Sequence, residues 1–121
     1  MTRADAPRTN GTMFRPWRQD DRPIWWTRVQ HEVSAPLDPD DRNAVEQQAL
    51  DTGLTRFAVV TCDECTVSTY LLVKAQDGAE AEEASARIVE AAHREAAHGR
   101  LGRRLLRSAT RYQPGAQLHA G

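Results

Sequence analysis

The chain has 121 residues, of which 40% are hydrophobic and 27% are charged, and its formal net charge is −1. This length and balance are typical of one globular domain with a modest core, and they exclude wholesale disorder. A nearly neutral chain is not built over its whole surface for nucleic acid. No apolar run approaches the roughly 18–20 residues that cross a bilayer, and the N-terminal residues lack the apolar segment of a secretory signal, so we expect a cytoplasmic protein.

Composition divides the chain into three parts. Residues 1–22 are rich in Arg, Asp, Pro, Thr and Asn with few apolar anchors, which predicts a flexible N-terminal arm. Residues 23–113 are predicted to form a single α+β domain. Residues 114–121, which read PGAQLHAG, are predicted to be a loose C-terminal tail.

The first predicted elements are a strand and a helix. From Ile24 apolar residues alternate with polar ones, and this period of two predicts a half-exposed strand that the Ser-Ala-Pro at 34–36 ends. A helix then begins at Asp38, which can cap it, with Pro39 at the first helical position. Gly53 is expected to end this helix.

Two strands, predicted over 57–62 and 66–75, lead to a long Ala-rich helix over about 79–97. One more strand completes the ferredoxin-like βαββαβ plan, in which two helices cover one face of a four-stranded antiparallel sheet. We expect that strand at Leu105–Tyr112, where it covers the open edge of the first strand. The alternative is a third helix, since helical spacing also joins Leu101, Leu105, Ala109 and Tyr112.

Cys62 and Cys65 form a C-x2-C motif at the tip of the predicted hairpin. A redox-active cysteine of this type lies at a helix N-terminus, whereas Cys65 precedes a strand. The negative charges of Asp63 and Glu64 between the two thiols disfavour a thiolate. Thiol–disulfide catalysis is therefore not expected.

Zinc would need two further ligands, which His93 and His98 could supply by their spacing. At 100° per residue, His93 lies about 140° from Ile88 in the predicted inward stripe, so it should point to solvent. His98 lies about 80° to the other side of Ile88. We therefore expect no metal, and two small, partly buried thiols that face each other across the turn.

His31 lies between Val29 and Val33 on the strand face assigned to the core. A lone inward histidine is more often a hydrogen-bonded core residue than a catalyst. In a cleft it would be the best acid–base candidate of the chain, as in a small monooxygenase-like enzyme of the ferredoxin-like fold. Neither a catalytic triad, a carboxylate pair nor a glycine-rich phosphate loop accompanies it, so the sequence favours a non-enzymatic protein without a cofactor.

The sheet face opposite the helices is left bare in this fold. Pairing of Cys62 with Cys65 would place Val59 opposite Ser68, and this register gathers apolar side chains on the bare face. The predicted interface residues are Trp26, Phe57, Val59, Tyr70 and Leu72. Such a patch indicates association with a second copy, a protein partner or a small ligand. The alternative is that the terminal segments fold over it.

The run GRLGRRLLRSATRY at residues 99–112 is basic and has no acid. Its arginines are Arg100, Arg103, Arg104, Arg107 and Arg111. Aromatic residues on an open sheet beside a basic segment are similar to the general plan of RNA-recognition domains. The strand TVSTYLLVKA lacks the signature of those domains. We therefore expect solvated arginines offset by the acidic segment GAEAEEA, with at most weak, salt-sensitive binding to nucleic acid.

In a regular strand over residues 105–112, Leu105 and Arg107 share one face and Leu106 shares the other with Ser108. Arg103 and Arg104 then belong to the preceding loop. Together these features predict a small, non-enzymatic binding or interaction module that forms a homodimer through the open sheet face. The alternatives are a nucleic-acid-associated accessory protein that uses the Arg100–Arg111 segment, and a small enzyme with His31 in a cleft.

Overall fold

The computed structural model describes residues 17–96 and 101–113. Its elements, in chain order, are a short 3-10 helix (Trp17–Gln19), strand β1 (Ile24–Val33), helix α1 (Pro39–Asp51), strand β2 (Thr55–Cys62), strand β3 (Thr66–Lys74), helix α2 (Gly78–Ala96) and strand β4 (Leu101–Arg111). The last element is a strand and not a third helix, so the βαββαβ order is confirmed.

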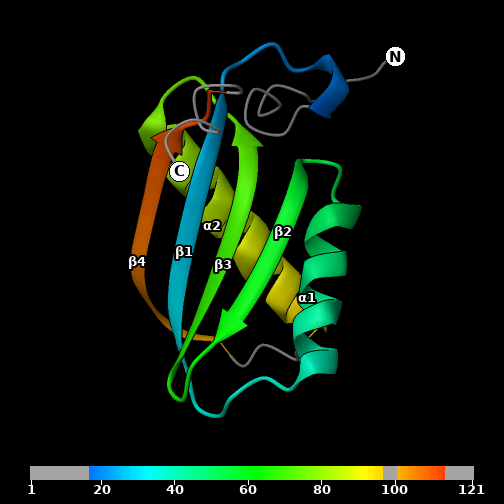
Figure 1. The fold of residues 1–121 in the computed structure, drawn as a ribbon, viewed down its shortest axis with the longest axis vertical. Helices are drawn as coiled ribbons and strands as arrows, with labels where there is room; N and C mark the ends of the chain where they lie inside the picture. The colour runs from blue at the N-terminus through cyan, green and yellow to red at the C-terminus, as the bar shows by residue number, and fades with distance from the viewer. Residues whose placement is uncertain (1–16, 97–100, 114–121) are drawn as a thin grey trace, which may run out of the picture.

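The four strands form one antiparallel sheet in the order β2-β3-β1-β4. Both helices lie on the same face of this sheet, with α2 crossing behind the central strands and α1 lying on the β2 side (Figure 1). This is the predicted ferredoxin-like α+β fold. We call the sheet face opposite the helices the outer face.

The alternation of residues along β1 decides which side chains enter the core. Thr27, Val29, His31 and Val33 are buried, and the residues between them are less so. Side chains of successive strand residues point to opposite faces, so these four lie on the helix side and their neighbours lie on the outer face.

Helix α1 begins and ends at the residues that its sequence predicts. The carboxylate of Asp38 accepts a hydrogen bond from the backbone N–H of Asp41 at 2.8 Å, and Pro39 is the first helical residue. Gly53 has a φ of 75°, which a glycine adopts without strain, and its N–H donates to the carbonyl of Leu50 at 3.1 Å.

A single core joins the sheet to the two helices. Its fully buried side chains come from β1, α1, β3 and α2, and include Val29, Val45, Leu71 and Val89. The apolar side chains that recur at regular intervals in the sequence therefore pack into one layer between the sheet and the helices. None of the helices in the described residues is both long and apolar enough to span a membrane.

Residues 17–22, which composition assigns to the flexible arm, contact the domain. The Lys74 ammonium donates to the carbonyls of Trp17 and Asp20 at 2.8 and 2.9 Å, and it lies 4.6 Å from the centroid of the Trp17 ring. The N–H of Trp17 also donates to the carbonyl of Gly53 at 3.2 Å. The remainder of the predicted arm, residues 1–16, and the predicted tail, residues 114–121, lie outside the described residues.

Candidate functional site

The five predicted interface residues come together on the outer face. Trp26 on β1 pairs with Leu72 on β3, and Val59 on β2 pairs with Tyr70. The rings of Trp26 and Phe57 lie 4.9 Å apart between centroids and are tilted by 44°. Trp26 remains 40% exposed although it is among the largest apolar side chains. The result is a continuous aromatic and aliphatic surface across β1, β3 and β2.

The register of the β2–β3 hairpin differs from the prediction. Cys62 pairs with Val67 rather than with Cys65, and Val59 pairs with Tyr70 rather than with Ser68. The displacement is two residues, and side chains in a strand repeat every two residues, so the assignment of faces is unchanged. The predicted register was wrong because the loop between the strands spans Asp63–Cys65, not only the two residues between the cysteines.

Strand β4 is irregular, and this changes which of its side chains reach the outer face. Opposite Gln30 and His31 the β4 partners are Leu106 and Arg104, so one extra residue is accommodated between them. A second extra residue lies between the partners of His31 and Val33. These are β-bulges, which redirect side chains.

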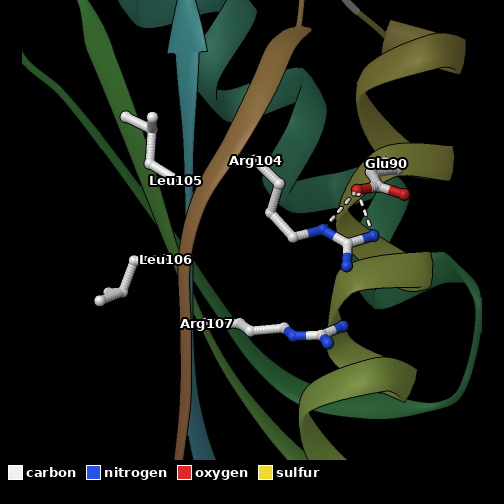
Figure 2. Close-up of a pocket in the computed structure, with 5 residues that line it drawn as sticks. All are labelled: Glu90, Arg104, Leu105, Leu106 and Arg107. Atoms are coloured by element: carbon white, nitrogen blue, oxygen red, sulfur yellow. Dashed lines mark hydrogen bonds and ion pairs between the residues drawn. The ribbon is translucent and has the colours of Figure 1, made fainter.

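The effect of the bulge is visible in Figure 2. Leu105 and Leu106, each 40% exposed, both point away from α2, whereas Arg104 and Arg107 both point toward it. The expectation that Leu105 shares a face with Arg107 is therefore wrong. The bulge therefore places Leu105 beside Leu106 on the apolar surface of β4, and no sequence period indicates this.

The arginines of β4 are engaged by acidic residues of the same chain. Arg104 donates from Nε and Nη2 to Glu90 on α2 at 3.0 and 2.8 Å, and Arg107 lies 2.7 Å from Glu83. Because β4 spans Leu101–Arg111, both Arg103 and Arg104 belong to this strand, and the prediction that they lie in the preceding loop was wrong. Further contacts join Arg107 to Glu82, Arg103 to Glu32, and Arg111 to the Trp25 ring. Arg100 lies outside the described residues.

His31 is buried on the helix side of β1, and it has a charged partner that the sequence does not reveal. Its Nε2 lies 3.1 Å from Oε2 of Glu90, the oxygen that also accepts from Arg104. Burial raises the pKa of Glu90, but hydrogen bonds from His31 and Arg104 more than offset this, so the net pKa is lowered. Because Glu90 is ionised, Nε2 of His31 carries the donated proton.

His93 is buried, with only 1% of its surface exposed, so the prediction that it points to solvent was wrong. The buried stripe of α2 is wider than predicted because the helix contacts β4 and α1 as well as the central strands. Strand β4 begins at Leu101, and its first residues cover the flank on which His93 lies. Burial, and secondarily the charge of His31, lower the pKa of His93 from 6.5 to about 4.

We call His31, Glu90, His93 and Arg104 the histidine cluster. Glu90, His93 and Arg94 lie at positions i, i+3 and i+4 of α2 and therefore share one side of the helix. With His31, Leu101 and Gly102 they line a cavity of about 250 Å³. Sequence reasoning found His31 but missed its partners, because only the fold brings α2 and β4 beside it.

The cysteines do not face each other across the hairpin. The Cys62 thiol donates to the carbonyl of Asp63 at 3.2 Å and accepts from the N–H of Leu37 at 3.3 Å, whereas Cys65 is exposed. In the part of the chain that the structure describes, no group of three His, Cys, Asp or Glu side chains is arranged to hold a metal ion. His98 lies outside the described residues.

We expect protein purified without a chelator to contain far less than one zinc per chain by elemental analysis. The reason is that the Cys62 thiol is hydrogen bonded to backbone groups, His93 is buried and Cys65 is exposed, so these side chains do not form one set of ligands. Cys62→Ser should leave the zinc content unchanged. A stoichiometric zinc that disappears in Cys62→Ser would contradict this expectation.

Comparisons of the chain with protein-family models, with curated proteins and with solved structures found no match. Function is therefore inferred from the two features that the fold assembles, the outer face and the histidine cluster.

Proposed function

We propose that this chain is a small binding module that associates with a second copy of itself through the outer face. The observation that carries the proposal is the exposure of Trp26 within a surface formed with Phe57, Tyr70 and Leu72. Contiguous apolar surface of this kind is stabilised when a partner removes it from water. Leu105 and Leu106 extend the apolar surface onto β4.

The charges on the outer face favour a second copy as the partner. Arg28 and Glu32 lie on the same face of β1, four residues apart, and have opposite charges. The Arg28 guanidinium lies 5.8 Å from the centroid of the Tyr70 ring, and its Nε is buried without a hydrogen-bond partner among the described residues. In a two-fold contact each residue occurs twice, so Arg28 of one copy can face Glu32 of the other.

We expect sedimentation velocity and light scattering to show a dimer, twice the 13.5 kDa of one chain, at micromolar concentrations. Tyr70→Glu should weaken the dimer by about 100-fold or more, since a two-fold interface would enclose two unpaired carboxylates. Circular dichroism should show an unchanged fold, because the Tyr70 side chain lies outside the core between the sheet and the helices.

Asn43→Glu is the matched control, because it adds the same charge at an exposed position of α1 on the helix side of the sheet. It should leave the dimer intact. A wild-type protein that remains a monomer up to millimolar concentration would contradict the proposal. Equal weakening by the two variants would also contradict it, since it would point to an interface that includes α1.

A further inference from the structure

His93 is buried without hydrogen bonds, which is unusual for an imidazole. Both its ring nitrogens, and Nδ1 of His31, are enclosed and have no partner among the described residues. A buried polar group without a partner lowers stability by about 1–3 kcal/mol, so most buried polar groups are hydrogen bonded. Such an exception in a cluster with a charged partner indicates a role other than stabilising the fold.

The groups around His93 cannot neutralise a proton placed on it. From β1 it faces His31, whose Nε2–H is already donated to Glu90. From α2 the neighbours are Glu90 and Arg94, and from β4 Arg104 also bonds to Glu90. The buried residues of α1 and β3 are all non-titratable: Val45, Ala49, Val67, Ser68, Thr69, Leu71 and Val73. A protonated His93 would thus be a buried cation with its single nearby carboxylate shared by two other donors.

The part of the fold that encloses His93 includes the start of an edge strand whose pairing is interrupted. His93 lies three residues before the end of α2, and the first residues of β4 line the same cavity. Strand β4 is an edge strand that pairs only with β1, and both of its irregularities lie opposite Gln30–Val33. Residues of an edge with interrupted pairing can open at a lower free energy than the whole domain.

We propose that the histidine cluster is an acid-sensitive latch, in which protonation of His93 in mildly acidic solution releases residues 101–104 of β4 from α2 and β1. The core between the sheet and the helices stays folded, because its residues lie on other elements. The proton that binds His93 causes the change. The first part of β4 then moves between a closed state, which the Arg104–Glu90–His31 bonds stabilise, and an open state. The latch does not depend on dimer formation through the outer face.

Linkage gives the expected size of the effect. With a His93 pKa of 6.5 in the open state and about 4 in the closed state, the opening equilibrium should rise about 20-fold between pH 7 and pH 5. The sign follows from the lowered pKa: the closed state is favoured above pH 6.5 and loses this advantage as the pH falls toward 4. Glu90 stays ionised over this range because its own pKa is lowered.

Amide hydrogen exchange of the full chain, corrected for the intrinsic effect of pH, tests the latch. Protection of residues 101–104 should fall about 20-fold from pH 7 to pH 5, and at each pH these residues should exchange at a lower free energy than β3, which exchanges only by unfolding of the whole domain. In His93→Phe, which keeps a ring of similar shape but cannot titrate, the pH dependence should disappear. Gln47→Glu, an exposed change on α1, is the control and should behave as the wild type.

Three results would overturn the latch: protection of residues 101–104 that is independent of pH, protection of residues 101–104 equal to that of β3 at both pH values, or a pH dependence that persists in His93→Phe. If His93→Phe does not fold, an NMR titration of the wild-type imidazoles decides the question. A His93 midpoint near pH 4–5 supports the proposal, and a midpoint of 6.5 or above contradicts it.

Discussion

Leu71→Ala should lower the free energy of unfolding by about 3–5 kcal/mol, because the leucine is fully buried at the centre of the core and its truncation leaves a cavity. Leu71 lies on β3 between Thr27 of β1 and Ala58 of β2 and faces the helices. A domain of this size has a total stability of about 5–15 kcal/mol, so a substantial fraction would be lost. Urea unfolding followed by circular dichroism, at one fixed protein concentration, measures the change.

The adjacent residue provides the matched control. Leu72 has the same side chain but lies on the outer face and is partly exposed. Leu72→Ala should cost about 1 kcal/mol or less in the unfolding of the monomer, since little surface returns to water. Equal losses in the two variants would show that the outer face is as enclosed as the helix side, which would also remove the basis for the proposed dimer.

The sequence predicts the fold well where local signals agree. In β1 the period of two separates the buried Thr27, Val29 and His31 from the residues of the outer face. At α1 the Asp38 cap and Gly53 mark both ends within a residue or two. These signals depend on near neighbours in the chain, so they need no knowledge of the tertiary structure.

The outer face could be predicted even though the hairpin register could not. The loop after Cys62 is longer than the cysteine pairing implied, and the register moved by two residues. An error of one residue would have moved Val59 and Phe57 to the helix side, whereas an error of two leaves each on its own face. Trp26, Tyr70 and Leu72 were therefore grouped correctly with Phe57 and Val59 because the register error was an even number of residues. The predicted pairing itself was not correct.

The remaining features depend on tertiary contacts that a single sequence does not encode locally. The bulges of β4 reverse the expected face of Leu105, and they arise from how β4 meets β1. His93 was misplaced because a helical wheel assumes one buried side, whereas α2 is covered by β4 and α1 as well as by the central strands. The partnership of His31 with Glu90, 59 residues away in the chain, has no local signal.

Glu90→Ala should lower the free energy of unfolding by about 2–3 kcal/mol at pH 7. The larger part comes from His31, whose buried Nε2–H loses its acceptor, at a cost of about 1–3 kcal/mol. The half-exposed Arg104 contributes about 1 kcal/mol or less, because solvent screens its attraction to the carboxylate. Chemical unfolding at pH 7 measures the loss, and Arg104→Met should reproduce only the smaller part.

Glu90→Gln separates the hydrogen bond from the charge. Its amide oxygen can still accept from His31, so the loss at pH 7 should be about half that of Glu90→Ala. The pKa of Glu90 in the folded protein is below its ordinary value of 4.5, so the stabilisation by the carboxylate is present above pH 4.5 and is lost as the pH falls through the folded value. The glutamine variant should lack this step but keep the loss of stability between pH 6.5 and about 4 that His93 causes. Equal losses in the alanine and glutamine variants would contradict the role of Glu90 as the acceptor for His31, because a retained oxygen would then make no difference to the buried imidazole.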